Sequence, residues 1–141
     1  MENSPRITLL LSQFLTLYKN NLNALLARND IDLTTEMSTV LAILWKKDKR
    51  KQQEIADILL RDKGGITKII NNLEKRGLVK RVADEADART KIIALTDTGK
   101  DLEKQVDPLS RGLLEKALGN IDEEVLATTR YALNQMIQQL K

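Results

Sequence analysis

The side chains that could do chemistry in this chain gather in a short segment near its middle. Their spacing of three and four residues places them on one face of a helix: Gly64, Thr67, Lys68, Asn71 and Lys75. Hydroxyl, amide and ammonium groups in that arrangement can form hydrogen bonds and neutralise an anion. No nucleophile stands beside a base, so the pattern is typical of binding rather than of catalysis.

A second group of charged residues follows directly. Leu78 to Val82 and Lys91 to Leu95 are rich in Val and Ile, and the stretch between them is polar. This pattern predicts a β-hairpin whose tip carries Asp84, Glu85, Asp87 and Arg89. Carboxylates on a solvated tip are poor candidates for acid-base catalysis, whereas an arginine there is free to reach an anionic partner.

Composition removes several function classes. The 141 residues are enough for one domain, and 42% of them are hydrophobic, so the chain can bury a core. There is no Cys and no His, which excludes disulfides, Cys/His zinc sites and imidazole catalysis. Aromatic residues make up only 3%, too few for a surface that stacks single-stranded bases. We therefore expect no enzyme, no metal and no cofactor.

The net charge of +3 is unevenly distributed along the chain. From Lys46 to Lys91 there are 14 Lys and Arg against 8 Asp and Glu, a net of +6, while the rest of the chain carries −3. A basic centre between acidic flanks is the distribution expected where one surface meets phosphate.

The elements around these residues form a recognisable motif. A short helix over Gln52 to Leu60 and a tight turn at Arg61 lead to a second helix capped by Asp62, with Ile66, Ile69, Ile70 and Leu73 on its buried side. Two short helices followed by a hairpin form a winged helix-turn-helix, whose second helix can enter the DNA major groove.

Long amphipathic helices are predicted at both ends of the chain. One of about 25 residues starts at Ser4 and Pro5, another follows Thr34 as N-cap, and two more follow Thr96 and Asp122. Their apolar faces could close a core within one molecule. Pairing with a second copy fits better, because the long helices lie at the chain ends. We thus expect a mainly α fold with a small β-hairpin wing: a winged helix-turn-helix over residues 33–99 and helical dimerisation regions over 1–32 and 100–141.

The location of the protein is also predicted. No apolar run approaches the roughly 20 residues that span a bilayer, and the N-terminus lacks a secretory core. We expect a cytoplasmic protein without a membrane segment.

At this point the sequence resembles the multiple antibiotic resistance regulator (MarR) family of bacterial transcription factors. The resemblance covers Thr34 to Gly99 and is carried by Asn-Leu-Glu-Lys-Arg-Gly-Leu-Val at 72–79, Asp-Ala-Arg at 87–89 and Leu-Thr-Asp-Thr-Gly at 95–99. It implies a homodimer that reads a pseudo-palindromic site in double-stranded DNA. It also implies a repressor, less often an activator, that a small aromatic or anionic ligand can release.

The resemblance also assigns roles to residues. It implies that the helix from Lys63 to Arg76 enters the major groove and that Arg89 enters the minor groove, with Asp87 as its orienting partner. The sequence departs from the family pattern in two respects. Lys51 stands where a Ser or Thr usually caps the first short helix, and Gly64 with Gly65 opens the second, which loosens its first turn.

Several residues of the helix-turn-helix and the hairpin are expected to contact DNA. Asn71 could bind adenine through N6 and N7, Lys68 could reach guanine or phosphate, and Thr67 could touch a thymine methyl group or a phosphate. The full set is Lys51, Lys63, Gly64, Gly65, Thr67, Lys68, Asn71, Arg81, Asp87, Arg89 and Lys91. No residue pattern selects a ligand pocket.

A different kind of partner remains open from the sequence. A winged helix can serve as a protein-interaction module whose basic face meets an acidic protein surface, without specific DNA binding. Because the chain has no Cys and no His, a regulator of this sequence cannot respond through cysteine oxidation or a histidine-bound metal. The effector is then a small organic ligand, or there is no effector.

Overall fold

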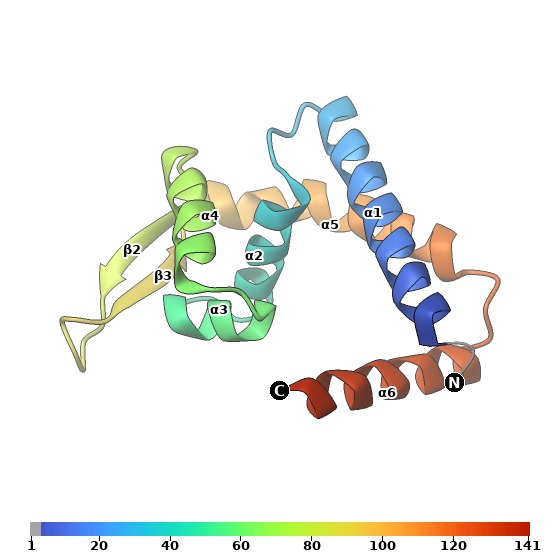
Figure 1. Cartoon of the computed structure of the whole chain (residues 1–141). Coiled ribbons are helices and arrows are strands. Elements are labelled where there is room, and N and C mark those ends of the chain that lie inside the picture. Colours follow the sequence, from blue (N-terminus) through green and yellow to red (C-terminus); the bar gives the residue numbers. More distant parts are fainter. Residues whose placement is uncertain (1–3) are drawn as a thin grey trace.

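A computed structural model describes residues 4–141, with side chains from residue 6 onward, and it confirms the predicted fold class. The elements in chain order are α1 (Ser4–Arg28), α2 (Thr35–Lys46), β1 (Arg50–Lys51), α3 (Gln52–Leu59), α4 (Lys63–Lys75), β2 (Val79–Ala83), β3 (Lys91–Leu95), α5 (Asp97–Leu118) and α6 (Glu123–Leu140). We call α2, α3, α4 and the three strands the winged part. Figure 1 shows α5 running from the winged part to α1 and α6, while the β2–β3 hairpin projects from the opposite side.

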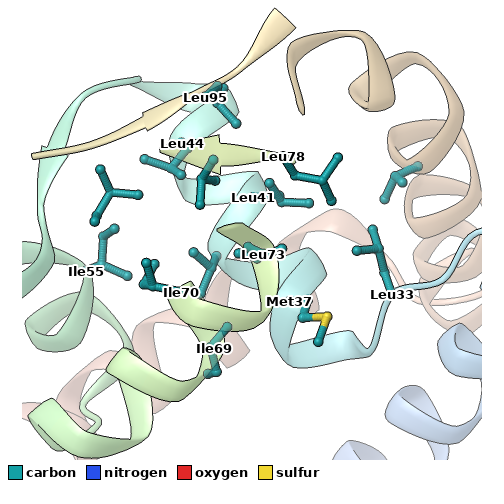
Figure 2. Close-up of a cluster of buried hydrophobic side chains, with 14 of the residues drawn as sticks. Leu33, Met37, Leu41, Leu44, Ile55, Ile69, Ile70, Leu73, Leu78 and Leu95 are labelled. Atoms are coloured by element: carbon teal, nitrogen blue, oxygen red, sulfur yellow. The ribbon is translucent and has the colours of Figure 1, made fainter. Parts of the chain in front are cut away.

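The core of the winged part forms around α4. Ile66, Ile70 and Leu73 repeat at helical spacing and are fully buried. They pack in one cluster with α2, α3 and β3, through side chains that include Leu41, Leu44, Ile55 and Ile93. Figure 2 shows several of these side chains converging between the helices. Because one face of α4 is buried in this way, its polar face must point outward.

The wing contains one strand more than the sequence predicted. The sheet has the order β1-β3-β2, and both pairings are antiparallel. β1 pairs Arg50 with Ile93 and Lys51 with Ile92. A strand of two basic residues shows no alternation of polar and apolar side chains, so the sequence predicted the β2–β3 hairpin without β1. The consequence is that Lys51 is fixed beside the wing.

Most predicted helix starts are confirmed. Thr34 accepts a hydrogen bond from the Met37 amide, Asp62 from Gly65 and Thr96 from Gly99. Asp122 is the N-cap residue of α6, as predicted, but its side chain accepts no such bond. α1 begins at Ser4 as predicted.

The ends of the helices are less regular. Gly77 takes a left-handed conformation after α4, with φ of 70°. Gly119 ends α5 in a right-handed conformation. Leu60 turns the chain between α3 and α4 with φ of 52°, a conformation that residues other than glycine rarely adopt. The turn of the helix-turn-helix therefore contains a leucine in a left-handed conformation. The sequence does not predict this conformation, because leucine is not a typical turn residue.

Gly99 joins α5 to the winged part. A Cβ atom built on Gly99 would lie 2.0 Å from the Leu78 carbonyl oxygen, so no side chain fits between α5 and the start of β2. The Gly99 carbonyl accepts a hydrogen bond of 2.9 Å from Trp45 Nε1 on α2. The structure thus gives a physical reason for the glycine of Leu-Thr-Asp-Thr-Gly, and Trp45 packs against the core beside it.

The end helices leave much apolar surface uncovered within one chain. No described residue of α6 is buried, and large exposed apolar side chains on α1 include Ile7, Leu10, Phe14 and Leu17. A groove of about 550 Å³ between α1 and α6 is lined mainly by apolar side chains, among them Leu10, Val125 and Met136. Tyr18 stacks on Phe14 and packs against the core, and its burial raises the pKa of the phenol, which stays neutral at physiological pH.

Replacing Gly99 with Ala should destabilise the fold by about 3 kcal/mol, because the new methyl group overlaps backbone that cannot move aside cheaply. The matched control is Gly112→Ala in the same helix, where nothing lies within 4 Å. The control should raise the free energy of unfolding by about 0.5 kcal/mol through better helix propensity. Urea denaturation of both variants measures the difference, and equal stabilities would contradict the close approach.

Candidate nucleic-acid interface

The outward face of α4 is the centre of the candidate interface. Lys63, Gly64, Lys68 and Asn71 are exposed on it, opposite the buried stripe. Asp62 holds the first turn together, with its Oδ1 accepting from the Gly65 amide at 2.6 Å. A Cβ on Gly65 would lie 2.9 Å from that oxygen, so glycine at this position leaves room for the cap. Gly64 is less constrained, because its nearest contact of this kind is at 3.9 Å.

Thr67 connects the two helices of the motif. Its hydroxyl donates to the Lys63 carbonyl at 2.8 Å and accepts from Gln52 Nε2 at 2.7 Å. The hydroxyl therefore fixes the start of α3 against α4. Gln52 was not singled out from the sequence, since an isolated glutamine carries no signal of its own.

Asn71 and Arg81 also contact each other. Arg81 extends from β2 to α4, where its guanidinium donates to Asn71 Oδ1 at 2.8 Å and to Glu74 Oε1 at 2.8 Å. The Arg81 side chain is 22% exposed. Two expected contact residues are thus joined in a network that includes a carboxylate the sequence did not indicate.

A basic cleft lies between the motif and the wing. Its volume is about 350 Å³, and its walls include Lys51, Lys63, Arg89 and Lys91. All four are exposed, and within residues 4–141 none of the four forms an ion pair. Four unpaired cations around one cleft create a strong positive potential, which attracts an anion.

The carboxylate of Asp87 forms hydrogen bonds within the wing loop. Its Oδ1 accepts from the Arg89 backbone amide at 3.0 Å, and its Oδ2 accepts from the Thr90 hydroxyl at 3.3 Å. Among the described residues Asp87 bonds to the backbone of Arg89 and forms no ion pair with its guanidinium, so the orientation of that side chain stays a prediction. The Asp shapes the loop backbone, as Asp side chains often do in turns.

Other kinds of site find no support in the part of the chain that is described. No group of three or more potential ligands there could hold a metal ion. No described helix is long and apolar enough to cross a membrane.

Known proteins resemble this chain in sequence. The MarR family model matches residues 33–91. The HTH-type transcriptional regulator TtmR of Methylorubrum extorquens is 36% identical over 78 residues, which are 55% of this chain and 40% of that protein. The chain therefore spans less than half the length of this relative.

Solved structures match over nearly the whole chain. CouR from Rhodococcus jostii RHA1, bound to p-coumaroyl-CoA, has a TM-score of 0.83 and 25% identity, covering 92% of this chain and 90% of that one. The S. aureus MepR–DNA complex has a TM-score of 0.83 at 24% identity, covering 94% and 96%, a likeness of fold. The winged helix-turn-helix and the match over residues 33–91 make this part of the chain similar to the MarR family, and the solved neighbours share the fold of the whole chain.

Proposed function

We propose that this chain is a sequence-specific, DNA-binding transcriptional regulator that acts as a homodimer on a pseudo-palindromic operator. The observation that carries the proposal is the cleft of four unpaired cations beside the exposed polar face of α4. Double-stranded DNA offers both a row of phosphates for the cations and base edges for the helix. The relatives named as transcriptional regulators favour this reading over a protein-interaction module.

Each part of the surface has a role in this proposal. α4 lies in the major groove with Lys68 and Asn71 toward the bases, while Arg89 enters the adjacent minor groove, whose negative potential attracts arginine. Lys51, Lys63 and Lys91 contact phosphates. Gly64 and Gly65 allow the start of α4 to approach the DNA closely. Asp87, Thr67 and Arg81 contribute by holding other groups in position.

Dimerisation follows from the end helices. Large apolar side chains stay exposed along both α1 and α6, and apolar surface gathered in this way marks an interaction site. A second copy of the chain buries them and sets the distance between two winged parts. Residues 1–32 and 100–141 then serve as the dimerisation region and residues 33–99 as the DNA-binding domain.

The protein acts as a repressor on DNA in the cytoplasm. It is not an enzyme. A small aromatic or anionic ligand releases it from the operator. CouR, a structural neighbour, is itself bound to p-coumaroyl-CoA, which is both aromatic and anionic. Without Cys and His, this chain cannot sense through thiol oxidation or a histidine-bound metal.

Arg89→Ala should weaken DNA binding at least about tenfold with little change in thermal stability, since the Arg89 side chain is exposed and unpaired among the described residues. Fluorescence anisotropy with a labelled duplex enriched from a random pool measures the affinity. Arg28→Ala, which removes an exposed cation at the end of α1, is the control and should change the affinity less than about twofold. An unchanged affinity for Arg89→Ala would remove Arg89 from the interface.

Binding should also depend steeply on salt, because each phosphate contact releases counterions. Raising the salt from about 50 to 200 mM should reduce the affinity by about a thousandfold for an interface with six or more phosphate contacts. The same anisotropy titration, repeated at several salt concentrations, gives the slope. A flat response would argue against a phosphate-dominated interface.

The dimer is tested separately with Leu10→Glu, which places a charge in the groove between α1 and α6. Sedimentation equilibrium should give about twice the 16.0 kDa of one chain for the wild type and a monomer for the variant at the same concentration. Ile58→Glu introduces the same charge at an exposed position of α3 and should remain dimeric. A monomeric wild type would contradict the proposed assembly.

A further inference from the structure

The outward row of α4 consists of groups whose hydrogen-bonding character can be assigned. Lys68 and Lys75 are exposed and carry only donors, and Gly64 adds no side chain. The Thr67 hydroxyl is engaged by Lys63 and Gln52, so Asn71 is the exposed member of this row that offers both a donor and an acceptor. Which of its two ends faces the DNA decides which base edges the row can recognise.

Arg81 settles the orientation of that amide. Its guanidinium has five N–H donors and no acceptor, so only the oxygen of Asn71 can face it. The Asn71 Oδ1 atom accepts from Arg81 at 2.8 Å, and Nδ2 makes no hydrogen bond to the other described residues. The exposed end of Asn71 is therefore a donor, like its neighbours in the row.

Glu74 keeps Arg81 in this position. Its Oε1 accepts from the other terminal nitrogen of Arg81 at 2.8 Å, so the guanidinium is held at two points one turn apart on α4. Arg81 is mostly buried between β2 and α4. Freeing Asn71 Oδ1 for a base would leave a guanidinium donor unpaired at a partly dehydrated site, which is unfavourable.

We infer that Arg81 and Glu74 act as positioning residues that commit Asn71 to donating, so that the contact row of α4 selects guanine over adenine. Guanine presents two acceptors, N7 and O6, in the major groove, whereas adenine places an N6 donor beside N7. The paired contact of an Asn with adenine needs the amide oxygen to be directed at the base, whereas Arg81 holds this oxygen toward β2. This inference rests on the proposed function and adds the base preference to it.

The experiment compares affinities for duplexes in which each base pair of one half-site of an enriched operator is changed in turn. Asn71→Ala identifies the base pair that Asn71 reads, because selectivity is lost there alone. At that pair the wild type should prefer guanine to adenine by about tenfold. The double variant Glu74→Gln with Arg81→Met keeps the net charge of the chain and frees Oδ1, so this ratio should fall by about tenfold or reverse.

Lys80→Met is the matched control, because Lys80 is exposed on β2, the strand that carries Arg81, and makes no contact with Asn71. It should weaken binding to all duplexes alike and leave the base ratio unchanged. Asn71→Asp gives a second test that does not disturb the network: the outward atom becomes an acceptor, so cytosine, whose N4 is a donor, should replace guanine.

The outcomes separate the two proposals. A wild type that selects adenine at the pair read by Asn71, or a double variant that retains the guanine preference, would overturn the inference while leaving specific DNA binding in place. If Asn71→Ala changes the selectivity at no base pair, the inference is likewise overturned and specific DNA binding is not. Absence of any sequence-selective binding by the wild type would instead overturn the proposed function, and the inference with it.

Discussion

The burial of one stripe of α4 is the constraint on which the rest of the structure depends. Ile66, Ile70 and Leu73 have no exposed surface and lock α4 against α2, α3 and β3. Side chains of that size each contribute on the order of 2 kcal/mol when fully buried, so rotation of α4 about its axis is strongly opposed. The polar face is thereby held outward without relying on any contact of its own.

Around that fixed helix, the charged groups are divided between two tasks. Arg81 is paired with Glu74 and with Asn71, and Asp87 shapes the wing loop. Lys51, Lys63, Arg89 and Lys91 line the cleft with no ion pair among the described residues. Paired groups hold geometry and unpaired cations remain available for phosphate, a separation that a surface built only for solubility does not need.

Much of this arrangement could be predicted from the sequence, because the strongest signals were local. The isoleucine stripe of α4 and the caps at Thr34, Asp62 and Thr96 follow from spacing and side-chain chemistry. β1 was missed because two residues show no periodicity, and the Leu60 turn because leucine is not a turn residue. The contacts of Arg81 with Asn71 and Glu74 join β2 to α4, and no pattern along the chain reports such a pairing.

The central claim is that two winged parts, held by the end helices, read one symmetric DNA site. Selecting bound duplexes from a random pool with the full-length protein tests it most directly. The account predicts enrichment of a pseudo-palindrome whose half-sites lie about 10 base pairs apart, or a multiple of that. Recovery of sequences without two-fold symmetry, or no enrichment over the starting pool, would contradict it.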